Sequence, residues 1–192
     1  AESSPHLEAF TGKGYEVLYM TDPVDEFMLP ELLEYDGKPM KSVSKGEVEL
    51  GSDEEKQETE KELEEKTKQY EKFLAALHKE LDEYVKEVRL SKRLTSSAVC
   101  LVGTEQDLSP HIERLLEKNK VDVPKNKRIM EINPDHDIVQ KLKARYDLRP
   151  TDLEFADHAQ LLLGQALLAE GSPLPDPAAF AGLVSKLMTE NL

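Results

Sequence analysis

The sequence predicts a mixed α/β (α+β) chain that ends in two helices suited to contact with a second copy. Three observations support this prediction: short β-rich segments alternate with amphipathic helices, a charged helix separates two such regions, and two apolar helices occupy the last part of the chain. We expect a small αβα layered subdomain over 1–52, a long connecting helix over 53–84, and a mixed α/β dimerisation domain over 85–192.

The first part contains the signals of a compact α/β unit. A short helix is expected over 5–10, followed by a β-rich segment at 15–20, an apolar helix at 24–35 and a second short strand at 40–44. Because helices and strands alternate over so short a stretch, they are expected to stack as layers.

The connecting helix begins with a capping-box pair, Ser52 and Glu55. Its roughly thirty residues span about 45 Å at 1.5 Å per residue. The first half is almost free of apolar residues, whereas apolar residues in the second half recur every three, four or seven positions. They predict either an amphipathic helix resting on a core or a coiled-coil seam, which would make the chain a scaffold dimerising through residues 63–88. The seam positions are Leu63, Tyr70, Leu74, Leu77, Leu81, Tyr84 and Val88.

The third part again alternates between the two periods. Runs with a period of two predict strands at 87–91, 98–103 and 128–132, and helical periodicity predicts helices at 108–119 and 135–146. This part therefore has its own sheet and its own covering helices.

Two apolar helices follow, and they predict assembly. The second begins with Asp176 as N-cap and Pro177 at the first helical position; the first ends at Gly171. Apolar residues cover so much of their circumference that one copy is not expected to bury them, and we predict a homodimer through a four-helix bundle. The predicted interface consists of Leu161, Leu162, Leu163, Ala166, Leu167, Leu168, Phe180, Leu183, Val184, Leu187 and Met188.

The composition limits the classes of partner and the compartment. A net charge of −14 opposes binding to nucleic-acid backbones and to anionic membranes, and no apolar run approaches the roughly twenty residues that span a bilayer. The single cysteine, Cys100, lies in an apolar run and is expected to be a buried thiol in a reducing cytosol. We therefore expect a cytoplasmic protein.

The motifs of common enzymes and metal sites are missing. The sequence contains no G-x-S-x-G, no H-E-x-x-H and no C-x-x-C, and its five histidines are scattered singly. The polar cluster at 133–136 is interpreted as a helix start, with Asn133 or Asp135 as the cap and His136 neutral. We expect no enzyme here, and no catalytic, cofactor-binding or metal-binding residues.

Two apolar sets could bind other proteins, although the residues alone favour ordinary core packing for each of them. One set stripes a helix in the third part and the other lies on the helix of the first part. The candidate binding residues are Leu108, Ile112, Leu115 and Leu116 in the first set, and Glu26, Phe27, Met28 and Leu29 in the second.

Several sequence blocks, read in order, resemble the heat-shock protein 90 chaperone family in its bacterial form. They include SSPHLEAF, GYEVLYMTDPVDEF, RLTSSAVCLV and MEINPDHDIVQKL, and the resemblance extends over residues 3–187. It implies the end of that family's middle domain followed by its C-terminal dimerisation domain.

The resemblance also implies a function and partners. The intact protein would be an ATP-driven, stress-induced cytoplasmic chaperone using ATP and Mg²⁺, with the nucleotide-binding domain upstream of this chain and no cofactor in it. The family's dimer contact would fall on the two terminal helices. Its contacts with non-native client proteins would fall on the set from Leu108 to Leu116 and on Glu26 and Phe27. The implied partners are a second copy, client proteins and co-chaperones.

Overall fold

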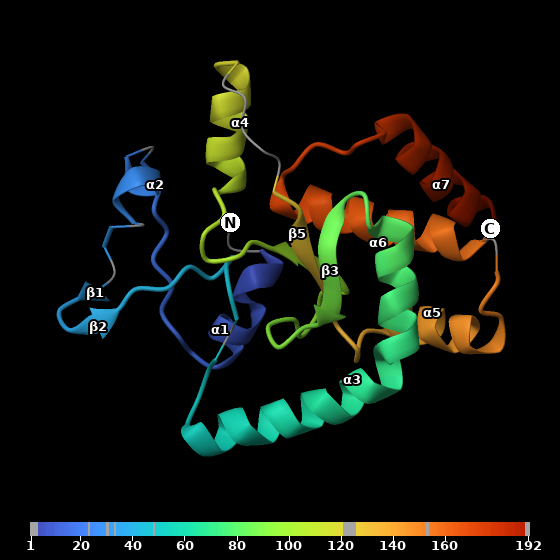
Figure 1. The fold of residues 1–192 in the computed structure, drawn as a ribbon, viewed down its shortest axis with the longest axis horizontal. Helices are drawn as coiled ribbons and strands as arrows, with labels where there is room; N and C mark the ends of the chain where they lie inside the picture. Colours follow the sequence, from blue (N-terminus) through green and yellow to red (C-terminus); the bar gives the residue numbers. More distant parts are fainter. Residues whose placement is uncertain are drawn as a thin grey trace.

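The computed structural model describes residues 4–22, 24–29, 31–32, 34–47, 49–120, 126–152 and 154–190. Figure 1 shows its elements in chain order. They are η1 (Pro5–Leu7), α1 (Glu8–Gly12), α2 (Asp25–Met28), β1 (Glu34–Tyr35), β2 (Lys38–Pro39), α3 (Asp53–Leu81), β3 (Val85–Leu90), β4 (Val99–Val102), α4 (Pro110–Lys118), β5 (Arg128–Ile132), α5 (Asp137–Leu148), α6 (Glu154–Glu170) and α7 (Pro177–Glu190).

The larger sheet has the strand order β3-β5-β4. Strand β5 pairs parallel to β3 and antiparallel to β4, so the last strand in the sequence lies in the centre of the sheet. The bounds of β5 agree with the predicted strand at 128–132, and β3 and β4 fall within two residues of their predictions. These three strand predictions are confirmed.

One face of this sheet carries the main core. Helices α3 and α6 both contact the sheet and each other, and α5 packs beside them. An aromatic cluster joins the three helices: the ring of Phe73 on α3 lies 5.9 Å from that of Tyr146 on α5 and 6.0 Å from that of Phe155 on α6. Such edge-to-face and tilted ring pairs add to the stabilisation from apolar burial.

Helix α3 combines two environments, as the sequence predicts. The capping box is present, because Ser52 Oγ accepts from Glu55 N and Glu55 Oε2 accepts from Ser52 N. Figure 1 shows the first half of α3 extending away from the body and the second half rising along the sheet. In the second half, Leu77 and Leu81 are fully buried in this chain's own core. The coiled-coil alternative through residues 63–88 is therefore wrong, because its main seam positions are occupied by intramolecular packing.

The two faces of the sheet contact different parts of the chain. Along β4, Val99 and Leu101 belong to the main core, whereas Cys100 and Val102 form a second buried cluster with Leu94. This division follows from the strand period of two, which sends successive side chains to opposite faces. The sheet is thus covered on both sides.

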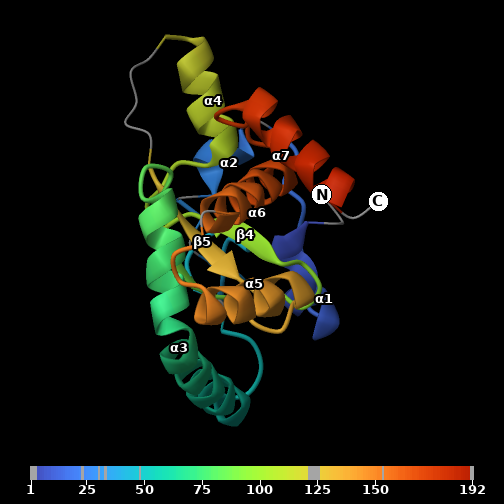
Figure 2. The same cartoon turned by 90° about the vertical axis from the view of Figure 1, so that its right-hand side faces the viewer.

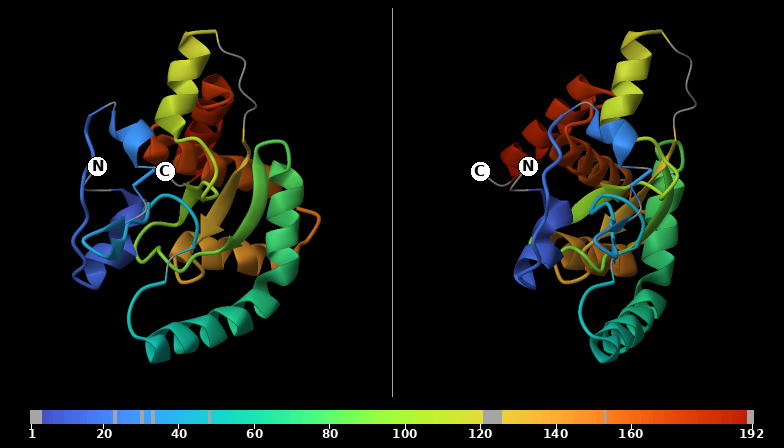
Figure 3. Two further views of the ribbon diagram at one scale, coloured as in Figure 1. Left: turned by 60° about the vertical axis from the view of Figure 1, so that its left-hand side comes forward. Right: turned by 90° about the vertical axis from the view of Figure 1, so that its left-hand side faces the viewer.

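The N-terminal segment lies on the second face. Ala9 N donates to Arg93 O at 3.1 Å, which places α1 beside the loop between β3 and β4. Residues 43–47 then run along the end of β4, where Gly46 N donates to Gly103 O at 3.0 Å. Figure 3 shows the N-terminal helix and the connection toward α3 next to the sheet.

The predicted αβα layers of the first part are not found. Residues 15–20 form no strand. Of the described residues in the helix predicted at 24–35, only Asp25–Met28 (α2) are helical. The strand expected at 40–44 is absent, and a short hairpin of β1 and β2 precedes it. The hairpin turn at Asp36 and Gly37 has positive φ at both positions, as a type I′ turn requires. Residues 15–20 have β-forming side chains but no neighbouring strand in the described chain, and Leu18 is exposed.

The start of α5 corrects the predicted cap. His136, not Asn133 or Asp135, is the N-cap, and its Nδ1 accepts a hydrogen bond from Ile138 N at 3.1 Å. Asn133 Oδ1 instead accepts from Asp135 N at 3.0 Å, one turn earlier.

Glu8 ties α1 to the loop between β3 and β4. Its carboxylate accepts from Thr95 N at 2.6 Å, from Ser96 N at 2.7 Å and from Ser97 N at 3.0 Å. Burial by itself raises the pKa of Glu8, but these hydrogen bonds and one from Ser97 Oγ outweigh it and lower the pKa from 4.5 to about 2. The ionised carboxylate therefore stabilises the docking of α1.

Glu8→Gln is expected to lower the free energy of unfolding at pH 7 by about 1–2 kcal/mol, because an amide NH₂ would face backbone N–H donors. The folded pKa lies below the unfolded one, so this contribution is present above pH 4.5 and is lost as the pH falls toward 2. Urea unfolding at pH 7 and at about pH 3.5 should show a smaller difference at the lower pH. Glu16→Gln, at an exposed position, is the control. An equal loss at both pH values would contradict this role.

Candidate functional site

Helix α7 begins where the sequence predicts, and none of its side chains is fully buried. Asp176 Oδ1 accepts from Ala179 N at 2.9 Å, and Pro177 is the first helical residue. None of the residues of α7 is buried, and Met188 is 60% exposed. Figure 2 shows α7 lying along α6 at the outside of the molecule. The half-buried apolar residues of α7 are Phe180, Leu183, Val184 and Leu187.

Helix α6 divides the predicted interface set between two environments. Leu162, Leu163 and Ala166 are buried in this chain's own core. Their inclusion in a contact with a second copy is corrected, because α3 and the sheet already cover them. Leu161 and Leu167 are half-buried, and Leu168 is 55% exposed. The accessible apolar surface of α6 is thus smaller than the sequence suggests.

A glycine lets the two terminal helices approach closely. A Cβ atom at Gly164 would overlap the ring of Phe180 on α7 and would lie 3.4 Å from Leu174 Cδ2. Phe180 is therefore seated directly on the backbone of α6. Since the ring fixes α7 at this one point, it also fixes which side of α7 faces outward.

Ion pairs hold the C-terminal half of α7 to the start of α6. Lys186 Nζ lies 3.0 Å from Asp157 Oδ2 and 3.8 Å from Glu154 Oε1. The hydrogen bond to Asp157 raises the pKa of Lys186. The pairs are exposed to solvent, so they orient α7 more than they stabilise it.

Helix α4 is the second candidate surface, and Figure 2 shows it projecting from the body. Leu108 precedes the helix and is exposed, Leu115 is 40% exposed, and Leu116 is half-buried. Ile112 is only 7% exposed, so it is a buried residue and does not belong to the outward surface of α4. The outward apolar surface is carried by Leu108 and Leu115.

The patch predicted in the first part is described only in part. Phe27 on α2 is 64% exposed, and Val24 and Met28 beside it are exposed as well. The side chain of Glu26 lies outside the described residues. Phe27 therefore offers apolar surface. The client-binding role of Glu26 stays a prediction.

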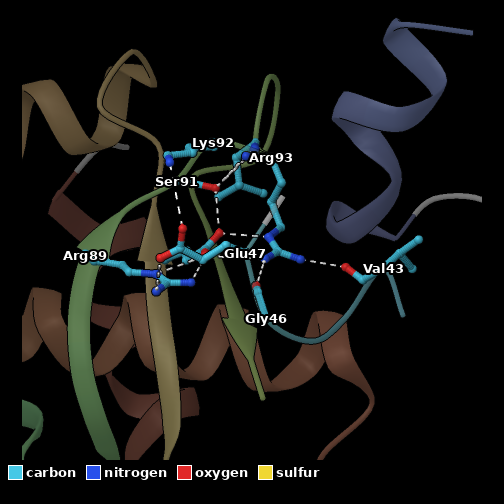
Figure 4. Close-up of polar contacts among 9 residues, drawn as sticks. Val43, Gly46, Glu47, Arg89, Ser91, Lys92 and Arg93 are labelled. Atoms are coloured by element: carbon cyan, nitrogen blue, oxygen red, sulfur yellow. Dashed lines mark hydrogen bonds and ion pairs between the residues drawn. The ribbon is translucent and has the colours of Figure 1, made fainter. Parts of the chain in front are cut away.

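A buried ion pair that the sequence analysis missed joins the N-terminal segment to the sheet. Arg93 is 1% exposed, and its Nε lies 2.8 Å from Glu131 Oε2. Its Nη1 and Nη2 donate to the carbonyl oxygens of Val43 and Gly46, each at 2.6 Å. Figure 4 shows the guanidinium reaching across to these two residues. The pair thus fixes residues 43–47 on the second face of the sheet.

Glu131 has further partners that satisfy its buried charge. Arg89 Nη2 lies 2.8 Å from Glu131 Oε1, and Ser91 Oγ donates to Oε2 at 2.9 Å. A signal was present in the sequence, since a carboxylate in the middle of the apolar strand RIMEI needs a buried cation. Sequence spacing did not indicate which of the arginines supplies it.

His6 is buried beside this network. Burial and, secondarily, the charge of Arg93 lower the pKa of His6 to about 4, although Glu131 acts in the opposite sense. The imidazole is neutral at pH 7. Its folded pKa lies below the unfolded value of 6.5, so its contribution to stability is lost as the pH falls from 6.5 toward 4.

The described residues give no indication of a metal centre or a reactive thiol. Within them, no group of three or more His, Cys, Asp or Glu side chains is placed to hold a metal ion. Burial raises the pKa of the Cys100 thiol, which keeps it protonated and unreactive. Over the same part of the chain, no helix is both long enough and apolar enough to cross a membrane.

Comparison with known proteins decides the family. A family model described as Hsp90 protein matches residues 1–192. The chain belongs to the Hsp90 family. It is 50% identical over 187 residues to the chaperone protein HtpG of Geobacter sulfurreducens, covering 97% of this chain and 29% of the relative. It is 47% identical over 191 residues to HtpG of Frankia casuarinae, covering 100% of this chain and 29% of the relative.

Membership of the Hsp90 family confirms the resemblance drawn from the sequence blocks. HtpG of Nocardia farcinica, 46% identical over 197 residues, gives the same result, with 100% of this chain and 30% of the relative covered. The chain spans about 30% of the length of these Hsp90 relatives. These relatives are named as chaperones. About 70% of their length lies outside the part that this chain matches.

Gly164→Ala is expected to displace α7, because the added methyl group overlaps the Phe180 ring. The overlap costs about 1–3 kcal/mol, which equals or exceeds the roughly 1 kcal/mol that Ala adds as a better helix former. Hydrogen exchange of the α7 amides should become faster. Gly182→Ala, where no atom lies within 4 Å of the new Cβ, should leave this exchange equal or slower. If hydrogen exchange of the α7 amides were unchanged in Gly164→Ala, the contact of Phe180 with Gly164 would not be what holds α7 in place.

Proposed function

We propose that this chain is the dimerisation and client-contact part of an ATP-dependent chaperone that assists protein folding under stress. In this proposal α6 and α7 hold two copies together, and α4 offers apolar surface to non-native proteins. The observation that carries the proposal is α7 itself, a 14-residue apolar helix with no buried residue. The relatives named as chaperones support the wider function.

A second copy is the occupant that best fits the uncovered surface of α6 and α7. Fully burying a Leu or Met side chain contributes about 1.5–3 kcal/mol, while association costs an estimated 4–15 kcal/mol. Several such residues are therefore needed from each copy, and a twofold axis uses each of them twice. The residues available for this contact are Leu161, Leu167, Leu168, Phe180, Leu183, Val184, Leu187 and Met188.

The projection of α4 supports contact with client proteins. Non-native chains expose apolar side chains, and Leu108 and Leu115 present matching surface away from the body. The chain's net charge of −14 keeps such a surface from promoting self-aggregation. Phe27 is a further candidate on the N-terminal side.

ATP and Mg²⁺ are assigned by this proposal to the rest of a longer protein. Gly12 ends α1 and Gly14 follows it, so this Gly-Lys-Gly segment is not a phosphate loop, which leads into a helix N-terminus. Co-chaperone binding and a cytoplasmic location stay predictions.

Leu168→Asp combined with Met188→Asp is expected to convert a dimer into a monomer. Each change would place a carboxylate in an apolar contact, which costs several kcal/mol when the charge is unpaired. Light scattering after gel filtration would measure the mass of the chain. Leu18→Asp, which changes another exposed leucine outside α6 and α7, is the control and should remain dimeric. If the double variant kept the dimer mass, the proposed contact would be ruled out.

Leu108→Asp combined with Leu115→Asp should weaken suppression of client aggregation at least several-fold and leave the dimer intact. The variant avoids Ile112, whose burial would confuse loss of binding with loss of stability. Turbidity of chemically unfolded citrate synthase, diluted into buffer with each variant, provides the measurement. Leu148→Asp removes an exposed leucine from α5 and serves as control. If the unaltered chain, the Leu108 and Leu115 double variant and Leu148→Asp suppressed aggregation equally, α4 would not be a client-binding surface.

A further inference from the structure

We propose that Arg128 positions the client-facing helix α4 by linking it to the end of α6, so that the arrangement of the dimer helices sets the placement of α4. This inference rests on the proposed functions of α4 and of the α6–α7 pair. It concerns a polar relay in which Arg128 joins two carboxylates from different elements, Glu113 on α4 and Glu170 on α6.

The guanidinium of Arg128 uses its two terminal nitrogens on two elements. Arg128 is the first residue of β5, its Nη2 contacts Glu113 Oε2, and its Nη1 lies 3.2 Å from Glu170 Oε1. None of the three side chains is more than 20% exposed, so solvent and salt screen these pairs less than surface pairs. A planar fork is needed to serve both carboxylates at once, and lysine has none.

The relay continues from Glu170 into the connection between the dimer helices. Glu170 Oε2 accepts a hydrogen bond from Ser172 Oγ, just beyond the end of α6. Gly171 has φ of 79° there, and Ser172 N donates to Leu167 O at 2.9 Å, which closes α6 with a Schellman turn. The Glu170 carboxylate is therefore held by the same turn that sends the chain toward α7.

At its other end the relay contacts α4, a short helix that depends on few contacts with the rest of the chain. A nine-residue helix is too short to be stable in isolation, so α4 depends on the residues that tie it to the body. Ile112 is buried, and Glu113, the next residue, pairs with Arg128 of the sheet. Glu113 Oε1 is buried and has no hydrogen-bond partner among the described residues. Loss of Arg128 would leave a largely buried carboxylate without its cation, which favours detachment of α4.

The decisive experiment is hydrogen exchange of the α4 amides in Glu170→Gln, measured on the full 192-residue chain. Glu170 lies on α6, and its carboxylate contacts Arg128 and Ser172. We expect the amides of Glu113 and Asn119, which donate to Ser109 O and Leu115 O at the two ends of α4, to exchange about three- to tenfold faster. Glu113→Gln should raise these rates at least as much, and Arg128→Lys should give an intermediate increase because lysine pairs with one carboxylate at a time.

The matched control is Asp147→Asn on α5, where the carboxylate pairs with Lys143 of the same helix and, among the described residues, with no residue of α6 or α7. It should leave α4 exchange unchanged. The relay is overturned if Glu170→Gln leaves α4 exchange unchanged while Glu113→Gln raises it, or if Asp147→Asn raises it equally. Should Glu170→Gln fold poorly, Ser172→Ala removes only the hydroxyl that holds Glu170 and should give a smaller increase of the same kind; no increase would count against the relay.

The outcome is separable from that of the proposed function. If the Leu108 and Leu115 variants suppress aggregation normally, α4 is not a client surface, whatever the exchange rates show. If those variants lose suppression and Glu170→Gln leaves α4 exchange unchanged, the client surface stands and the relay is wrong.

Discussion

The packing of α6 is the constraint on which the rest of the structure depends. This helix has to cover the sheet and α3 with one side and receive α7 on another. Leu163 serves the first contact, and its neighbour Gly164 serves the second by admitting the Phe180 ring to the helix backbone. A helix that is apolar around most of its circumference is usually central in a core. In this chain α6 is enclosed on all sides only if α7 and a second copy cover the apolar surface that the sheet and α3 leave exposed.

The two surfaces proposed to act outward are thus attached to the same body by different means. Helix α7 is seated by a ring on a glycine and oriented by exposed ion pairs, whereas α4 is linked to the sheet by one shielded ion pair. On the other face of the sheet, Arg93 and Glu131 fix the N-terminal segment. Each attachment involves few residues, which suits the outward roles proposed for α4 and α7.

The sequence was informative wherever local periodicity and capping decide the structure, and it failed where distant segments decide it. The helix starts at Ser52 and Asp176 and the strand at 128–132 follow from neighbouring residues. Burial of Leu162 rather than Leu168 depends on where the sheet lies, which periodicity does not specify. The strand predicted at 15–20 is absent because a strand requires a partner, not only β-forming residues. His136 replaces the expected caps because Asn133 bonds one turn earlier.

The central claim is that α7 leaves apolar surface that only a second copy covers. Sedimentation equilibrium of the unaltered chain, over about a hundredfold range of concentration, tests this most directly. We expect a mass of twice the 21.7 kDa of one chain over the upper part of the range, with dissociation on dilution. A mass of 21.7 kDa at every concentration, from a folded chain, would contradict the claim.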